Sequence, residues 1–161
     1  MSEITLLLHN IRSTHNVGSI FRTAEGFGVK RIVISGYTPY PKVPNDERLP
    51  HIVDKLTHQI HKTALGAEEL VDFEHVSDLG SWLAKNELPL VGLEQTPESI
   101  MIDKFTSPDK FVLVLGEEVH GIDAELLTKC TATVEIPMFG KKESFNVSVA
   151  AGIALYVLQT V

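Results

Sequence analysis

Residues 136–152 read Ile-Pro-Met-Phe-Gly-Lys-Lys-Glu-Ser-Phe-Asn-Val-Ser-Val-Ala-Ala-Gly, and the fold follows from what this stretch joins. An apolar strand ends at Pro137, a loop with one glycine and two lysines follows, and Ser144 and Asn146 then open an apolar helix. Backbone N–H groups in the first turn of a helix have no partner within the helix. Such a place suits a bound polar ligand, although Ser144 and Asn146 also fit a plain N-cap pair.

The composition predicts one globular domain over residues 1–161. The chain is 43% hydrophobic and 22% charged, as in soluble proteins with a sizeable core. No apolar run is long enough for a transmembrane helix, and the N-terminus has no signal-peptide pattern. The lone Cys130 cannot form an internal disulfide and is expected to be a small, buried apolar residue. These features predict a cytoplasmic protein without a membrane partner.

Charge is distributed unevenly along the chain. The net charge of −7 argues against a protein that holds nucleic acid by bulk charge. Residues 1–62 nevertheless hold eight Lys/Arg and five Asp/Glu, whereas residues 63–161 hold six and sixteen. If an anionic partner binds, we expect it to contact the N-terminal part and the pair Lys141-Lys142. Ordinary solvated surface charge is the other interpretation.

Six apolar runs read as β-strands. Several, such as Phe111-Val-Leu-Val-Leu115, are continuous rather than alternating, which is typical of parallel strands that are buried on both faces. The runs cover residues 4–9, 31–35, 69–75, 89–93, 111–115 and 132–136.

Helical patterns lie between the predicted strands. We expect helices over residues 17–27, 78–85, 124–130 and 146–161, with capping residues such as Asn16 and Asp123 and a closing Gly28 after the first. Alternating strands and helices predict an α/β fold, a three-layer sandwich with a mostly parallel sheet. Residues 37–50 contain four prolines and read as a long loop, a feature that is often functional.

Asn16, Gly18 and Arg22 follow the first predicted strand and belong to the first predicted helix. Ligands of open α/β sheets bind at the carboxyl ends of strands, where a guanidinium suits a phosphate or a developing oxyanion. Gly18 would let another backbone or a ligand approach closely. Without a ligand, Arg22 would pair with Glu25 on the helix surface.

A second turn, Gly116-Glu-Glu-Val-His-Gly121, follows the strand at residues 111–115. Its glycines allow tight turns and expose backbone N–H groups. The turn matches neither the dinucleotide-binding fingerprint nor the P-loop. Glu117 and Glu118 would repel a phosphate but could bind hydroxyls or an amine, and turn formation alone is the alternative explanation.

Three histidines raise the question of a metal site. His51, His58 and His61 are spaced close to one helical face, and three imidazoles could bind zinc. No carboxylate or thiol completes the set, so we expect no metal. No Ser-His-Asp, Cys-His or paired-carboxylate arrangement indicates a hydrolase either.

In this order, the three segments resemble the motifs of the SpoU/TrmH family of SPOUT RNA methyltransferases. The motifs are Asn-x-Gly-x-x-x-Arg, Leu-Gly-x-Glu-x-x-Gly and Ile-Pro-Met-x-Gly-x-x-x-Ser-x-Asn-Val-Ser. They match Asn16, Gly18 and Arg22, then Leu115, Gly116, Glu118 and Gly121, and finally residues 136–148. The resemblance extends over nearly the whole chain and departs at Phe145, where the family usually has Leu.

The resemblance implies a C-terminal trefoil knot, a homodimer, and methyl transfer from S-adenosylmethionine to a ribose 2′-hydroxyl in tRNA or rRNA. It implies catalytic or positioning roles for Arg22, Asn16, Glu118, Ser144 and Asn146. It implies a cofactor site near Leu93, Gly116, Ile136, Met138, Ser144 and Phe145. For RNA contacts we expect Arg12, Lys42, Arg48, Lys141 and Lys142. An arginine pKa above about 12 favours orientation and charge stabilisation by Arg22 over deprotonation.

The target RNA and two other functions stay open. By analogy with members that lack RNA-binding extensions, we expect tRNA rather than rRNA. A knotted dimer that binds RNA or S-adenosylmethionine without turnover is one alternative. A nucleotide-binding enzyme such as a dehydrogenase is another, and the missing fingerprint counts against it.

Overall fold

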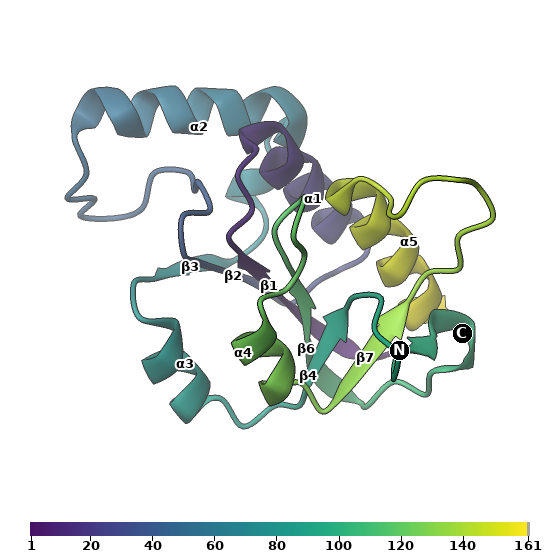
Figure 1. The fold of residues 1–161 in the computed structure, drawn as a ribbon. Coiled ribbons are helices and arrows are strands. Elements are labelled where there is room, and N and C mark those ends of the chain that lie inside the picture. Colours follow the sequence, from purple (N-terminus) through teal and green to yellow (C-terminus); the bar gives the residue numbers. More distant parts are fainter. Residues whose placement is uncertain (161) are drawn as a thin grey trace.

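A seven-stranded parallel sheet runs through the middle of the molecule, a computed structural model that describes residues 1–160 (Figure 1). The strands lie in the order β3-β2-β1-β6-β4-β7-β5, and each pair of neighbours is parallel. Their bounds are β1 Glu3–His9, β2 Arg31–Ser35, β3 Phe73–Val76, β4 Leu90–Leu93, β5 Ile100–Met101, β6 Lys110–Leu115 and β7 Ala132–Glu135.

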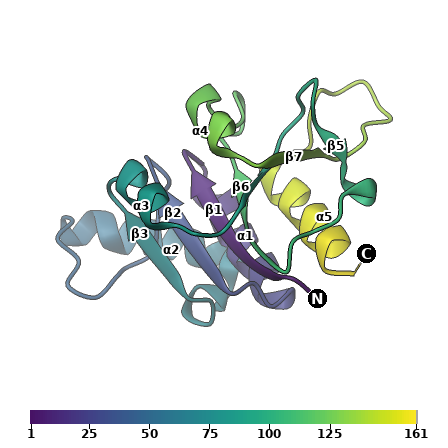
Figure 2. The same ribbon diagram turned by 90° about the horizontal axis from the view of Figure 1, so that it is seen from below.

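Helices cover both faces of this sheet. Figures 1 and 2 show one group of helices on one face and a second group on the opposite face. The first group is α1 (Thr14–Gly26), α2 (Pro50–Ala64) and α5 (Val147–Thr160), and the second is α3 (Leu79–Lys85) and α4 (Ala124–Lys129). The structure therefore confirms the three-layer α/β fold, while the trefoil knot stays a prediction.

The central strands show why the apolar runs are continuous. Successive side chains of a strand point to opposite faces, so a strand covered on both sides needs apolar residues throughout. Leu6 and Leu8 of β1 pack in one core with Phe21 of α1, whereas Leu7 packs in the other with Leu126 of α4. The exposed fraction of all three β1 leucines is 0%.

Two element starts differ by more than one residue from the sequence-based expectations. Helix α1 begins earlier because the Ser13 side chain, rather than Asn16, caps it by accepting a hydrogen bond from the Asn16 N–H. The expected strand over residues 69–75 is wrong at its start, since Ala67–Glu69 forms a 3-10 turn and β3 begins at Phe73. The terminal helix begins after Asn146 as expected, and its last predicted residue, Val161, lies outside the described residues.

Two elements were missed. The long helix α2 starts at Pro50, a residue that fits the first turn of a helix because its missing N–H has no helical partner there. The short strand β5 has no readable pattern, since it has only two residues, Ile100 and Met101, which are 41% and 36% exposed.

Gly18 explains how α1 and α2 come together. A Cβ atom at this position would lie 2.1 Å from Thr63 Oγ1 and 2.3 Å from the carbonyl oxygen of Ile60, both in α2. The sequence left open whether Gly18 makes room for another backbone or for a ligand, and the structure shows that it makes room for the backbone of α2.

No helix among residues 1–160 is both long and apolar enough to span a bilayer.

Candidate functional site

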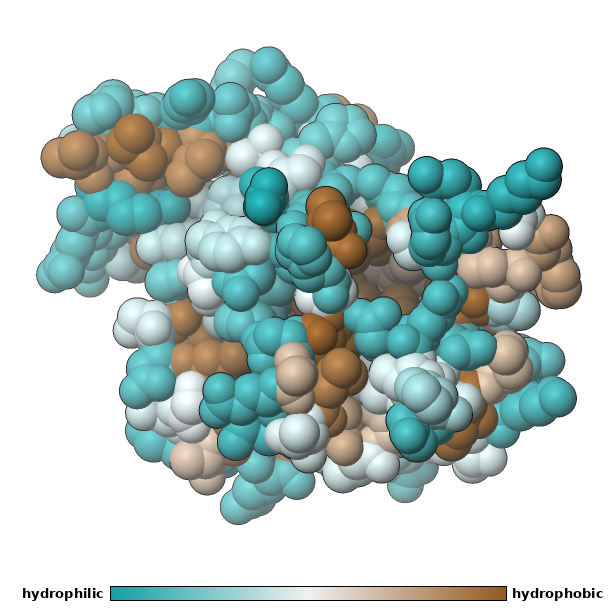
Figure 3. All heavy atoms as spheres, in the orientation of Figure 1, coloured by the Kyte–Doolittle hydropathy of each residue, from teal (hydrophilic) through white to brown (hydrophobic). Residues whose placement is uncertain are grey.

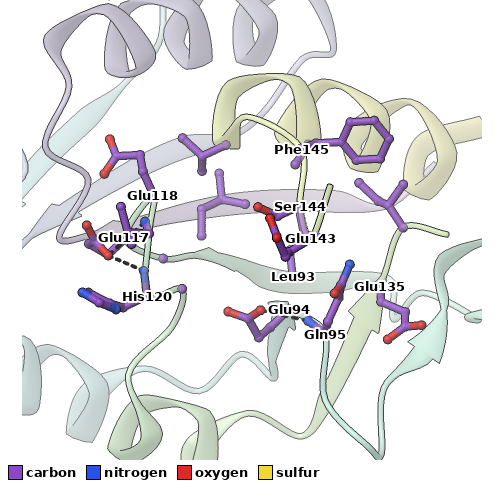
Figure 4. A pocket seen from close by; sticks show the side chains of 17 residues that line it. Leu93, Glu94, Gln95, Glu117, Glu118, His120, Glu135, Glu143, Ser144 and Phe145 are labelled. Atoms are coloured by element: carbon purple, nitrogen blue, oxygen red, sulfur yellow. Dashed lines mark hydrogen bonds between the residues drawn. The ribbon is translucent and has the colours of Figure 1, made fainter. Parts of the chain in front are cut away.

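A cavity of about 280 Å³ opens at the carboxyl ends of β4, β6 and β7. Figure 3 shows this hollow between the loop after β6 and the segment before α5, with hydrophobic atoms in its floor. Figure 4 shows the side chains around it. The lining comes from residues 93–95, 115–121, 135–136 and 143–145, with Val147 and Ala150.

The loop after β6 closes on itself between its two glycines. The backbone groups of Glu117 and Gly121 exchange two hydrogen bonds of 2.8 and 3.0 Å. A Cβ at Gly116 would lie 2.4 Å from the Gly121 carbonyl carbon, and Gly121 has a φ of +71°. Glu94, which follows β4, fastens the loop from outside by accepting a 2.9 Å hydrogen bond from the Ile122 N–H. Both glycines of the motif are thus needed for the shape of the loop.

The carboxylate of Glu118 joins this loop to the start of α1. It accepts hydrogen bonds from the N–H groups of Arg12 and Ser13, at 3.1 Å, and from Asn16 Nδ2, at 3.2 Å. Burial raises the pKa of Glu118, but the hydrogen bonds from Arg12, Ser13 and Asn16 together lower it below its ordinary value. Glu118 is therefore a charged clamp, and its acceptor sites are largely used within the protein.

Asn146 connects the third motif to the same cluster. Its Nδ2 donates a 3.1 Å hydrogen bond to Asn16 Oδ1, and its own Oδ1 accepts a 2.9 Å bond from the Ser148 N–H. Asn146 therefore caps α5 and holds Asn16 at the same time. The structure thus brings Asn16, Glu118 and Asn146, one residue from each motif, into a continuous hydrogen-bonded line.

Glu117 has a different setting from its neighbour Glu118. Its side chain is 8% exposed and lines the cavity. Oε2 accepts hydrogen bonds from the N–H groups of Val119 and His120, at 3.0 and 2.5 Å (the second drawn in Figure 4). Oε1 has no hydrogen-bond partner among the described residues and lies 3.6 Å from Arg12 Nε. This buried oxygen is therefore an acceptor without a hydrogen bond, and its charge is paired with the guanidinium of Arg12.

The cavity is acidic as well as apolar. Five glutamates line it, and Figure 4 labels all of them around the hollow. They are Glu94, Glu117, Glu118, Glu135 and Glu143. Such a site disfavours phosphate and favours cations and hydroxyl groups. Sequence reasoning missed Glu94, although its place directly after an apolar run could have suggested it.

The residues predicted to bind a cofactor gather here with one exception. Leu93, Gly116, Ile136, Ser144 and Phe145 all line the cavity, whereas Met138 does not. In Figure 4, the ring of Phe145 points away from Glu117 and Glu118, which lie on the opposite side of the hollow.

Arg22 is separate from this cluster. It is exposed on α1, does not line the cavity, and has no hydrogen bond or ion pair to the described residues. Within one chain, the structure therefore assembles four of the five predicted catalytic or positioning residues at or beside the cavity and leaves Arg22 outside.

The predicted RNA contacts fall into two groups. Arg12, Lys42, Lys141 and Lys142 are exposed. Arg48 instead holds the 37–50 segment together, since its guanidinium binds the carboxylate of Asp46 at 2.6 Å and the carbonyl oxygens of Tyr40 and Pro41. Arg48 also keeps the pKa of Asp46 far below its ordinary value. Its side chain is 20% exposed, which leaves little of it for a phosphate.

No group of three or more His, Cys, Asp or Glu residues within positions 1–160 is arranged to hold a metal ion. The three histidines noted above therefore do not form such a set in the described structure.

Comparison with known proteins gives one family. The model of the SpoU rRNA Methylase family matches residues 3–156. The 23S rRNA (guanosine-2'-O-)-methyltransferase RlmB of Coxiella burnetii is 31% identical over 159 residues, which covers 97% of this chain and 58% of that protein. The chain thus spans less than two thirds of the length of this curated relative.

Solved structures support the fold. The AdoMet-bound rRNA methyltransferase from Sinorhizobium meliloti superimposes with a TM-score of 0.79 at 21% identity, over 97% of this chain and 55% of that one. A structure solved to explain the 2-OH methylation of C/U34 on tRNA gives a TM-score of 0.75 at 20% identity, over 98% and 94%. At these identities the likeness establishes the architecture alone.

Proposed function

Because the chain belongs to the SpoU rRNA Methylase family, we propose that it transfers a methyl group from S-adenosylmethionine to a ribose 2′-hydroxyl of RNA. The observation that carries the proposal is the hydrogen-bonded line Asn146–Asn16–Glu118 beside an acidic cavity. It unites three distant motifs at the carboxyl ends of parallel strands, where α/β folds bind their ligands.

The chemistry of the cavity fits S-adenosylmethionine. Leu93, Leu115 and Ile136 offer apolar surface for an adenine ring. The carboxylates offer acceptors for ribose hydroxyls and a favourable field for the cationic sulfonium and ammonium groups. We assign the cofactor cradle to Leu93, Gly116, Ile136, Ser144 and Phe145, and leave Met138 outside it.

The residues of the chain mainly position the reactants. When bound, S-adenosylmethionine supplies a methyl group activated by its sulfonium, so that the ribose oxygen forms a C–O bond, the C–S bond breaks to a neutral thioether, and the hydroxyl proton leaves to water. Glu118 and Asn146 hold Asn16 and the loop before α1 in place. Ser144 contributes a hydroxyl at the cavity wall. Fixed geometry of this kind lowers the entropic part of the barrier.

The exposed position of Arg22 supports a site that is shared between two chains. It is exposed on α1, and the neighbouring helix α5 exposes Val149 and Tyr156 to 50% and 59%. We infer a homodimer in which α1 and α5 form the contact and Arg22 of one protomer completes the site of its partner. A guanidinium there would orient a phosphate and stabilise charge that develops on the 2′-oxygen.

Experiment must decide whether the substrate is rRNA or tRNA. The curated relative described above is named for 23S rRNA, so it gives no support to the expected preference for tRNA. We therefore propose an RNA substrate of either class, with rRNA as the first to test.

The free Cys130 fits a reducing cytoplasm, where we place the protein.

The direct test is methyl transfer to bulk RNA. Purified protein is incubated with radiolabelled S-adenosylmethionine and unmodified rRNA or tRNA, and the RNA is digested to nucleosides. Label in a 2′-O-methylnucleoside of one class is the expected result. Label only on a base would contradict the proposed reaction.

An Arg22→Ala variant separates an enzyme from a binding module. For an enzyme, methyl transfer should fall by a factor of at least about 100, while binding of S-adenosylmethionine measured by calorimetry persists. A wild-type protein that binds cofactor and RNA but methylates neither RNA class would favour the non-catalytic alternative.

A further inference from the structure

We propose that a second cavity, of about 550 Å³, receives the unpaired base of the acceptor nucleotide, an inference that rests on the proposed function. The cavity lies at the carboxyl ends of β1 and β2 and against α2, and nothing described so far occupies it. Its walls come from residues 12–14, residues 36–40, Arg48, Leu56 and Gln59.

The two cavities meet at Arg12. Its side chain lines the second cavity together with Tyr37, which raises the pKa of Arg12, and faces Glu117 of the first cavity at 3.6 Å. The backbone N–H groups of Arg12 and Ser13 bind Glu118, the clamp of the first site. A base in the second cavity would therefore carry its ribose to the boundary between the two, beside Glu118.

One wall of the second cavity is built before any ligand arrives. The ring of Tyr40 is stacked on His75, with centroids 4.0 Å apart, and the guanidinium of Arg48 lies 3.6 Å over the same ring. Asp46 fixes Arg48 in turn. Burial, followed by the charge of Arg48, lowers the pKa of His75, which favours the neutral ring in this stack. A preorganised wall loses little entropy when it binds a planar group.

Tyr37 supplies the group that a base would stack on. Its side chain is 55% exposed at the edge of the cavity, while its backbone is held independently by a 3.1 Å hydrogen bond from its N–H to Asn10 Oδ1. Unpaired RNA bases are recognised by stacking on aromatic rings and by hydrogen bonds to their edges. Gln59 and Thr14, which line the same cavity, carry the polar groups for such bonds.

The charges around the two cavities favour different parts of a nucleotide. The five glutamates of the first cavity repel a phosphate, whereas a base is neutral and Arg12 and Lys42 are exposed cations on the N-terminal part. The backbone of the RNA would thus follow these cations, with the base in the second cavity.

The test compares Tyr37→Ala with Tyr37→Phe, which retains the ring and loses only the hydroxyl group. Lys85→Ala, an exposed substitution on α3 in the opposite layer, is the control. Two readouts are used, the KM for RNA in the methylation assay and the affinity for a fluorescein-labelled mixed-sequence RNA hexamer at low salt. Thermal unfolding verifies that each variant is folded.

Tyr37→Ala should weaken hexamer binding and raise the KM for RNA by about 5- to 100-fold, with unchanged cofactor binding, whereas Tyr37→Phe should remain within about threefold of wild type. Equal values for Tyr37→Ala and wild type, or a wild-type protein that does not bind the hexamer, would overturn the inference. Binding of the hexamer that depends on Tyr37, without methylation of any RNA, would retain the base site and refute the proposed function.

Discussion

The side chain of Asn146 makes two sets of hydrogen bonds, and different substitutions remove them separately. Its Oδ1 caps α5, and its Nδ2 holds Asn16. Asn146→Asp keeps the acceptor for the cap but places a carboxylate oxygen against Asn16 Oδ1. We expect this variant to retain most of its stability and to lose methyl transfer. Urea unfolding and the nucleoside assay measure the two effects.

Asn146→Ala is the companion variant. It removes the cap as well, so it should lose about 1 kcal/mol of unfolding free energy together with methyl transfer. Full activity in Asn146→Asp would show that the link to Asn16 is dispensable and that Asn146 acts only as a helix cap.

Glu118 makes a prediction about pH. Because its pKa is lowered in the folded chain, its stabilising effect is present above the unfolded pKa, near the ordinary 4.5, and is lost as pH falls through the folded value. Glu118→Gln should therefore cost roughly 1–3 kcal/mol of unfolding free energy at neutral pH. The difference from wild type should shrink as the pH is lowered toward about 3.

Urea unfolding of both proteins over this pH range gives the measurement. Glu98→Gln, an exposed carboxyl in a turn, serves as the control and should change stability little at any pH. A gap between wild type and Glu118→Gln that widens on acidification would contradict the assigned role.

At the scale of elements, the approach of α1 to α2 depends on Gly18. Gly18→Ala places a methyl group against the Ile60 carbonyl and Thr63, where atoms would lie within 2.3 Å. Overpacking of this kind costs about 1–3 kcal/mol, more than the helix propensity of alanine returns. We expect a lower melting temperature by calorimetry.

Gly26 in the same helix is the matched control. A Cβ there meets nothing within 4 Å, so Gly26→Ala should stabilise the protein by up to about 1 kcal/mol. Equal effects of the two substitutions would show that α2 moves aside and that the close contact is not needed.

These elements also show what a sequence alone can predict. Strands β1 and β6 were predictable because strands buried on both faces need continuous apolar runs. Helix α2 was missed because a proline-rich loop leads directly into it, although Pro50 fits its first turn and the helix packs on α1. The short exposed β5 leaves no periodic signal.

The residues of the candidate site were likewise only partly predictable from the sequence. Glu118 and Asn146 stood in recognisable motifs, and the structure joins both to Asn16. Glu94 and Tyr37 did not, because each comes from a separate strand end and only the strand order places it beside the motifs. For Arg22 the sequence left open the strand ends and the helix surface, and the structure places it on the surface of α1.

At the scale of the whole molecule, the proposed dimer predicts complementation. Sedimentation should give twice the 17.8 kDa chain mass at micromolar concentration. Arg22→Ala and Asn146→Asp should each be inactive alone, since each damages both sites of its own dimer. In a mixed dimer, the Asn146→Asp chain can supply an intact Arg22 to the intact cavity of the other chain.

Equal amounts of the two variants, refolded together, should therefore recover about a quarter of wild-type methyl transfer, because half of the dimers are mixed and each holds one intact site. The nucleoside assay measures the recovery, and each variant refolded alone is the control. If Arg22 served the cavity of its own chain, every site in the mixture would contain one damaged residue, and no activity would return. The mixture thus tests the dimer and the shared site without any assumption about which RNA is the natural substrate.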